Sequence, residues 1–337
     1  MRSFFAMLIL AGVASACSVP VFRYALERWP VSTYTALVIY DQPLPVEQQQ
    51  RLDDLARQGN LKIVAVHKDH LTPEQADIWD ERPLPFVSIR YPDSEATSYA
   101  AWSGKLDDLP KQLIDSPARR QLVRWLAEGV SVVWIVVEGD EATDKLLRHE
   151  LARFQKAFKL PEVEPVDLRT ALPLELRFEI LSLKRDSDEA LFVEQLVNIT
   201  PELREAKGPI VFPVLGRGRV LWGIFGEGLN ANEISTSANY ACGACSCQVK
   251  EANPGVDLLL PADWPTLLKV EDQPKPPAMP QPVIPPGLQD EPNKQGPLAE
   301  VTTTSFNPAW IWQGTAVLAV LLLIIGLVLG RRSPPTN

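Results

Sequence analysis

The stretch that decides the fold contains three short apolar runs: YTALVIY at residues 34–40, LKIVAV at 61–66 and LPFVSIR at 84–90. Each run is rich in Val, Ile, Leu or aromatic residues and is flanked by Pro, Gly, Asn or Asp, which is typical of buried strands. Between the first two runs, residues 46–58 place apolar side chains at helical spacing and end at a Gly-Asn pair. The order strand, helix, strand predicts a parallel β-α-β unit.

Segments on both sides extend this unit. Residues 21–29 follow Pro20 and carry an apolar face at helical spacing, which predicts a first helix. The run at 84–90 is followed by a Tyr-Pro-Asp-Ser turn and by residues 98–102, which together predict an antiparallel hairpin. A final helix is expected over residues 116–128.

The order of these elements over residues 17–129 resembles the thioredoxin fold. In that family a cis-proline opens the third strand of the domain, and the resemblance implies this conformation for the Leu84–Pro85 bond. The same order then recurs, with strand-like runs at 130–137, 176–183 and 209–225 and helical patterns between and after them. We therefore predict an α/β protein of two thioredoxin-like domains, residues 17–129 and a divergent copy at 130–270.

The beginning of the chain has the pattern of a secretory signal peptide. Residues 1–16 contain Arg2, an apolar stretch and the cleavage motif Ala-Ser-Ala. Cleavage after Ala16 leaves Cys17 as the mature N-terminus. A cysteine at that position is also where bacterial lipoproteins carry their lipid, so lipid attachment is a further hypothesis. The usual lipobox has Leu three residues before the cysteine, whereas this chain has Ala14.

The end of the chain predicts a membrane anchor. Residues 309–330 contain about 20 residues without a charge, enough to span a bilayer core of about 30 Å, and the cytoplasmic tail 331–337 begins with two Arg. Residues 271–308 form a proline-rich linker that favours polyproline II. The sequence thus predicts a single-pass protein of the cell membrane, with its bulk periplasmic or extracellular and the lipid bilayer as a partner.

Composition excludes some classes of function. The chain has 337 residues and a net charge of −9, which argues against a nucleic-acid partner. The glycine-rich stretch 216–228 falls on a hairpin and does not precede a helix, so no nucleotide is predicted. His67, His70 and His149 form no triad, and no G-x-S-x-G motif is present. Whether the protein is an enzyme stays open, with a non-catalytic role favoured.

The four cysteines carry the only strong chemical signal. Cys17 stands at the start of a predicted helix, which stabilises a thiolate, but Pro20 occupies the position of a second redox cysteine. Lipid attachment, a structural disulfide, and a reactive or metal-binding thiol all remain open for Cys17. Cys242, Cys245 and Cys247 offer C-x-x-C and C-x-C spacings, which suit a structural disulfide, an exchangeable disulfide or a soft metal such as copper. Zinc is less favoured because no second C-x-x-C or paired His is present.

Two segments, CSVPVFRYALERW at 17–29 and CSCQVKEANPGVDLLL at 245–260, resemble an uncharacterised family of bacterial exported, membrane-anchored proteins. The resemblance supports the anchored topology and implies no activity or cofactor. It makes Cys17, Cys245 and Cys247 the first positions to test, as candidate catalytic residues, with Cys242 as a further candidate. The cysteine spacings make Cys242, Cys245 and Cys247 the weak candidate metal ligands. The favoured hypothesis is a binding or assembly module for an extracytoplasmic protein partner, with structural cysteines. The alternative is thiol-disulfide redox chemistry or handling of copper or zinc.

Overall fold

The computed structural model describes residues 18–92, 99–245 and 249–270, and these residues belong to one compact unit. The predicted signal peptide, Cys17, Cys247, the proline-rich linker and the predicted membrane span all lie outside the described residues. None of the helices in the described part combines the length and apolar character that crossing a membrane requires. The predicted division of the unit between residues 129 and 130 stays a prediction.

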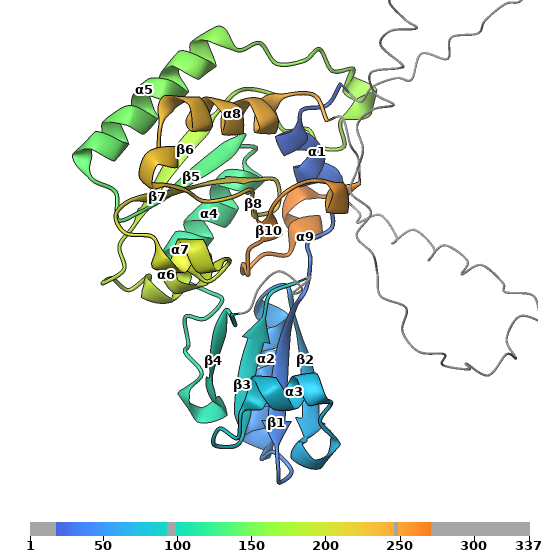
Figure 1. Cartoon of the computed structure of the whole chain (residues 1–337). Coiled ribbons are helices and arrows are strands. Elements are labelled where there is room, and N and C mark those ends of the chain that lie inside the picture. The colour runs from blue at the N-terminus through green and yellow to red at the C-terminus, as the bar shows by residue number, and fades with distance from the viewer. Residues whose placement is uncertain (1–17, 93–98, 246–248, 271–337) are drawn as a thin grey trace, which may run out of the picture. The chain divides into compact units, whose positions relative to one another are not determined.

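The first sheet has four strands in the order β2-β1-β3-β4 (Figure 1). The strands are β1 (Tyr34–Tyr40), β2 (Leu61–His67), β3 (Phe86–Arg90) and β4 (Trp102–Lys105). β1 runs parallel to β2 and antiparallel to β3, and β3 pairs antiparallel with β4. The predicted β-α-β unit and hairpin are both present, and the Leu84–Pro85 peptide bond is cis.

Alternation along β1 separates the two faces of this sheet. Ala36 and Val38 point into the main core with α2 (Val46–Gln58), whereas Leu37 and Ile39 pack in a smaller cluster with α3 (Pro73–Trp79). Successive side chains of a strand point to opposite faces, so this pattern places the two helices on opposite sides of the sheet.

The second sheet repeats the same plan. Its strands include β5 (Val132–Val137), β6 (Phe178–Leu183), β7 (Ile210–Leu215), β8 (Arg219–Val220), β9 (Ile224–Phe225) and β10 (Val256–Asp257). The order β6-β5-β7-β8 has the same parallel and antiparallel pairings as β2-β1-β3-β4. β10 extends this sheet beside β8, and β9 pairs with β7.

Helices cover both faces of the second sheet (Figure 1). The helices that pack here are α1 (Val21–Arg28), α4 (Pro117–Ala127), α5 (Glu141–Ala157), α6 (Ala190–Val197) and α8 (Ala231–Cys242). On β5, Val132 and Trp134 face α1, α5 and α8, whereas Val133 and Ile135 face α4 and α6. The helices α1 and α4, which the sequence groups with the first β-α-β unit, therefore pack against the second sheet.

A buried polar network joins the first sheet to these helices. The hydroxyl of Tyr91, the residue after β3, donates to the carbonyl of Gln195 in α6, and the Gln195 side chain accepts from Arg119 in α4. The Tyr34 hydroxyl of β1 donates to the carbonyl of Asp257 at 2.9 Å. Burial lowers the pKa of Arg119 to about 10. The main core is continuous between the two sheets at this place.

The prediction of a mixed α/β fold is confirmed, with differences in detail. The second strand of the first hairpin was expected at 98–102, but it begins at Trp102. The return strand expected at 220–225 is divided into β8 and β9, and at Gly223 between them a Cβ would lie 2.2 Å from Leu203. Short helices α3, α7 (Pro201–Glu205) and α9 (Trp264–Leu268) were not predicted, although Thr72 and Gln75 form a capping box before α3.

Candidate functional site

The two cysteine-bearing segments lie side by side. Pro20 and Ala244 form an antiparallel bridge. The Val21 amide donates to the carbonyl of Gly243 at 3.0 Å, and the Cys245 amide donates to the carbonyl of Val19 at 2.9 Å. The beginning of α1 is thus hydrogen-bonded to the chain that leaves α8. The two segments that carry the sequence resemblance therefore lie together. We call the contact between the described residues of 19–34 and 243–257 the joint.

Cys242 is the last residue of α8 and lies buried in the core beside α1. The helix begins at Asn230, whose side chain accepts from the Glu233 amide at 3.1 Å, and its buried face is made of small and apolar residues. Cys242 is fully buried, is not in a disulfide, and has a pKa raised by burial from 9.0 to about 12. Such a thiol stays protonated at neutral pH, so it lacks the nucleophilic form. Cys245 is 1% exposed.

We predict that Cys242 resists alkylation in the folded protein. At pH 9, iodoacetamide should modify it at no more than about 1/500 of the rate seen in guanidinium, because a pKa near 12 leaves about one thiolate in a thousand, whereas about half of the unfolded thiol is ionised. The raised pKa also means that Cys242 opposes folding only above about pH 9, where the unfolded thiol ionises. A Thr236→Cys variant, on the exposed side of the same helix, is the control that should react at once. Rapid labelling of Cys242 without denaturant would contradict the assignment.

A second set of contacts ties the segment after the cysteine cluster to the N-terminal segment. Asp257 of β10 is buried, and its carboxylate contacts Arg219 at 3.2 Å and Lys250. The Ser32 amide donates to the same carboxylate at 2.7 Å. Lys250 also donates to the Ser32 hydroxyl at 2.6 Å. We call Asp257, Lys250 and Arg219 the buried triad.

The remaining donors of the triad bind main-chain carbonyls. Lys250 donates to Pro30 at 2.7 Å, and Arg219 donates to Pro254 at 2.9 Å and to Asn253 at 2.8 Å. Gly255 turns the chain between Pro254 and β10 with φ +110°. A Cβ at this position would lie 2.2 Å from the Val220 carbonyl oxygen. The segment 250–257 is therefore shaped by contacts within the fold.

Helix α1 contributes a buried ion pair on its other side. Arg23 Nε lies 2.8 Å from Glu27 Oε1, and both side chains are inaccessible to solvent. Glu27 also accepts from the amides of Arg169 and Thr170 at 2.9 and 3.0 Å, and Arg23 donates to the carbonyl of Leu172 at 2.7 Å. Burial lowers the pKa of Arg23, and Glu27 opposes that shift. The pair fixes the long connection between α5 and β6 onto α1.

The histidines and glycines singled out in the sequence have structural contacts. His67 Nε2 lies 3.1 Å from the Asp41 carbonyl and Nδ1 accepts from the Asp69 amide at 3.3 Å, so both ring nitrogens are engaged. Across the described residues, no group of three or more His, Cys, Asp or Glu side chains is placed to hold a metal ion. Gly216 adopts φ +62°, and a Cβ there would lie 2.7 Å from Ala25 of α1. This glycine permits close helix packing.

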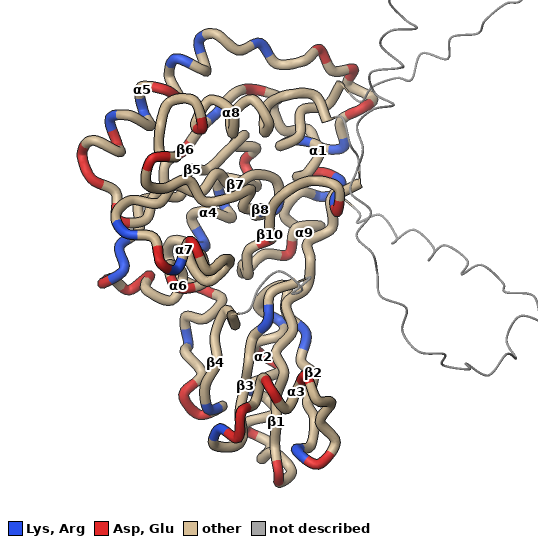
Figure 2. The backbone as a smooth tube through the Cα atoms, in the orientation of Figure 1, with Lys and Arg blue, Asp and Glu red and all other residues tan. Residues whose placement is uncertain are grey.

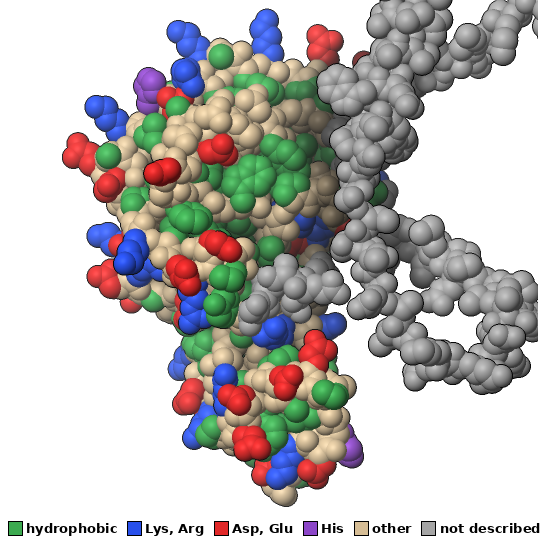
Figure 3. Space-filling model, viewed as in Figure 1, with side chains coloured by type: hydrophobic (Ala, Val, Ile, Leu, Met, Phe, Trp, Pro, Cys, Tyr) green, Lys and Arg blue, Asp and Glu red, His purple; other side chains and the backbone are tan. Residues whose placement is uncertain are grey.

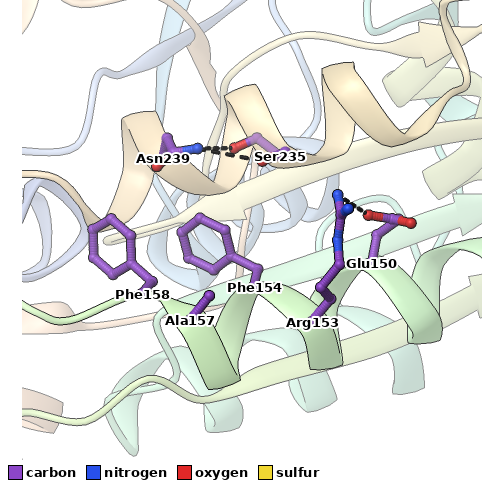
Figure 4. Close-up of a pocket in the computed structure, with 7 residues that line it drawn as sticks. All are labelled: Glu150, Arg153, Phe154, Ala157, Phe158, Ser235 and Asn239. Atoms are coloured by element: carbon purple, nitrogen blue, oxygen red, sulfur yellow. Dashed lines mark hydrogen bonds and ion pairs between the residues drawn. The ribbon is translucent and has the colours of Figure 1, made fainter.

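A groove of about 360 Å³ lies between α5 and α8 (Figure 4). Phe154 and Phe158 stack with ring centroids 4.7 Å apart and point toward α8. Glu150, which is 7% exposed, pairs with Arg153 at 2.6 Å at one end of the groove. On α8, the Asn239 side chain donates to the Ser235 carbonyl at 2.8 Å. The polar groups that we describe in the groove are bonded within their own helices.

The sequence pattern did not indicate the buried charges. Arg23 and Glu27 stand four residues apart in a helix, a spacing that usually marks an exposed pair. Lys250 and Asp257 lie in a polar stretch without periodicity. The one available signal was their position inside the two segments that carry the resemblance. No family model matches this chain, and no curated protein matches it.

Proposed function

We propose that the protein is an exported, membrane-anchored, non-catalytic binding or assembly module whose cysteines stabilise its fold. The observation that carries this proposal is the joint between residues 19–34 and 243–257, where the described residues of both cysteine segments pack into the core. Cys242 is buried with a pKa near 12, which suits a structural thiol and not an attacking one.

We further propose that each sheet belongs to a thioredoxin-like unit. The repeated strand order supports this assignment. In such units the redox cysteines follow the first strand. Here residues 41–45 follow β1 and residues 138–140 follow β5, and neither connection contains a cysteine. The plan therefore serves a binding role better than dithiol exchange.

Chain connectivity favours a disulfide at the joint. In the sequence, Cys17 is two residues from Val19 and Cys247 is two residues from Cys245. The Cys245 amide donates a hydrogen bond to the Val19 carbonyl. Two extended residues span at most about 7 Å, so a bond from Cys17 to Cys245 or Cys247 is within the reach of the chain. We propose that Cys17 pairs with Cys245 or Cys247 and that Cys242 stays reduced. Secretion across the membrane supplies the oxidising compartment such a bond needs.

Peptide mapping of the full chain, alkylated before digestion and without reductant, tests this pairing. We expect a cross-linked peptide that joins Cys17 to Cys245 or Cys247, and alkylation of Cys242 only after denaturation. A glutathione titration should give a potential below about −300 mV, as for structural disulfides. A lipid-modified Cys17 would contradict the pairing, and a potential in the range of exchange proteins would contradict the non-catalytic role.

The alternative is thiol-disulfide exchange or soft-metal binding through Cys17, Cys242, Cys245 and Cys247. The same reach of the chain from Cys17 to the cluster supports it, because thiolates are the preferred ligands of Cu(I). Elemental analysis of the full chain purified without chelators distinguishes it. Stoichiometric copper or zinc, lost in a Cys245→Ser variant that keeps its fold, would establish the metal site. Metal content unchanged by that variant would exclude it.

We also propose that residues 309–330 anchor the chain in the cell membrane, with residues 1–16 as its export signal. The uncharged length of this span and the two Arg that follow it support the anchor. The folded part would stand outside the cytoplasm. Resistance of the full chain to alkaline extraction from membranes, with release of a chain truncated after residue 308, is the expected result.

A further inference from the structure

The exposed face of α5 carries a continuous stripe of basic side chains. Lys145, Arg148, Arg153 and Lys156 are exposed on the helix, and Lys159 follows two residues after its end. Within the helix, Lys145, Arg148, Arg153 and Lys156 are spaced by three, five and three residues, which keeps them and exposed His149 on one side of a 3.6-residue helix. We call Lys145, Arg148, His149, Arg153, Lys156 and Lys159 the basic face. Figure 2 shows basic positions along the tube of α5, and Figure 3 shows basic side chains projecting from this edge of the molecule.

The charge of the basic face is opposite to that of the chain. Residues 145–159 contain five Lys and Arg and one acid, a net charge of +4, in a chain of net charge −9. The single acid is Glu150, which is buried. Arg148 pairs with Asp144 at 2.7 Å and Arg153 pairs with Glu150. No ion pair is found among the described residues for Lys145, Lys156 or Lys159.

The opposite side of α5 explains why the helix forms. Leu147, Leu151 and Phe154 pack toward the second sheet and α8, and the Asp140 side chain accepts from the Thr143 amide at 2.7 Å at the start of the helix. Packing and capping therefore specify α5 without the cations. Their gathering on one face needs a separate explanation.

We propose that the basic face binds an anionic lipid bilayer. This inference rests on the proposed anchor, which keeps a bilayer within reach of the fold at all times. Residues 271–308 could span at most roughly 100 Å at about 3.1 Å per residue, so an anchored fold can approach the membrane. A basic helix face gains affinity from each Lys or Arg near an anionic surface.

Two observations favour an extended anionic surface over a small anionic ligand, and the proposed anchor makes the bilayer that surface. The basic side chains spread along α5 over roughly 20 Å, at 1.5 Å per residue, which suits an extended surface more than a single anionic group. The rest of the chain is strongly acidic, so an anionic surface repels it and attracts the basic face. The aromatic rings of the neighbouring groove point toward α8, so the contact would be electrostatic.

Lysine footprinting of the full chain in lipid nanodiscs tests the proposal. We expect acetylation of Lys145, Lys156 and Lys159 to slow by at least about threefold in discs of 70:30 phosphatidylcholine and phosphatidylglycerol, relative to phosphatidylcholine alone. The effect should disappear in 0.5 M NaCl, because salt screens exposed charges. Lys62, Lys105 and Lys111 are exposed elsewhere on the fold and should react equally in all discs.

A matched pair of variants separates the basic face from total charge. Lys145→Glu combined with Lys159→Glu should remove the protection of Lys156. Lys62→Glu combined with Lys111→Glu changes the net charge equally and should leave that protection intact. All four side chains are exposed, so neither pair is expected to unfold the protein.

Each outcome has a defined meaning. Equal acetylation in both discs would overturn the inference and leave the anchor standing. Protection of the same size in phosphatidylcholine discs, relative to the chain in detergent, would show that lipid charge is not what the basic face binds and would overturn the proposal. If the chain does not enter discs, the anchor fails, and the same footprint with added phosphatidylglycerol vesicles decides the basic face. Protection there supports it, and none overturns it.

Discussion

Replacing Asp257 with alanine should lower the free energy of unfolding by about 3–5 kcal/mol, the usual cost of removing one partner from a buried ion pair. The carboxylate balances two cations, Arg219 and Lys250, whose side chains are 9% and 7% exposed. It also accepts from the Ser32 amide. Without it, both cations remain in the core with only neutral partners, which are main-chain carbonyls and, for Lys250, the Ser32 hydroxyl. We expect this to be among the most damaging substitutions in the described part of the chain.

Guanidinium unfolding of the full chain, followed by circular dichroism, measures the effect. The midpoint should fall while the dependence on denaturant stays constant, which indicates a change in stability and not in the exposed surface. Glu251→Ala is the matched control, because Glu251 is an exposed acid in the same segment and should leave the midpoint in place. An Asp257→Ala midpoint equal to that of Glu251→Ala would show that the triad does not hold the joint.

The second large effect concerns the ion pair of α1. Glu27→Ala should lower the free energy of unfolding by about 3–5 kcal/mol, because it leaves the charge of the Arg23 guanidinium without a counter-charge in the core. It also removes the acceptor for the amides of Arg169 and Thr170. The double variant Arg23→Met, Glu27→Leu removes both charges and should recover at least half of the lost stability.

A double-mutant cycle of Arg23 and Glu27 measures their coupling directly. Coupling of about 1–3 kcal/mol is expected for contacting residues in one network. The exposed pair Arg57 and Asp54, which are 69% and 64% exposed, provides the matched cycle and should show far weaker coupling. If the two cycles give equal coupling, burial of the α1 pair has no energetic importance.

The sequence predicted strands and helices well where the hydrophobic pattern is regular. The run at 34–40 and the helix at 46–58 have the predicted bounds, because one is uniformly apolar and the other has clear helical spacing. The pattern could not show which sheet α1 and α4 cover. An amphipathic helix specifies that one face is buried, and the surface that buries it depends on tertiary contacts between distant residues.

The candidate site was predictable in its cysteines and not in its charges. Cys242 is recognisable because the chain has four cysteines and three of them form the C-x-x-C and C-x-C spacings of residues 242–247. Lys250 and Asp257 resemble ordinary surface residues of a polar loop. Their burial comes from Ser32 and Arg219, which are far away in the sequence. The buried triad needs the whole fold before it can be recognised.

The joint between the two ends of the folded region also limits how the protein can be made. Ser32 and Asp257 are separated by 225 residues in the chain, and a ribosome delivers the N-terminal residue first. The apolar face of α1, including Phe22, packs against β5, β7 and α8, so its set of partners is complete only after residues 243–245 emerge. Contacts of such long sequence separation form slowly and leave apolar surface exposed meanwhile. Folding of this region therefore completes only after residue 257 has left the ribosome.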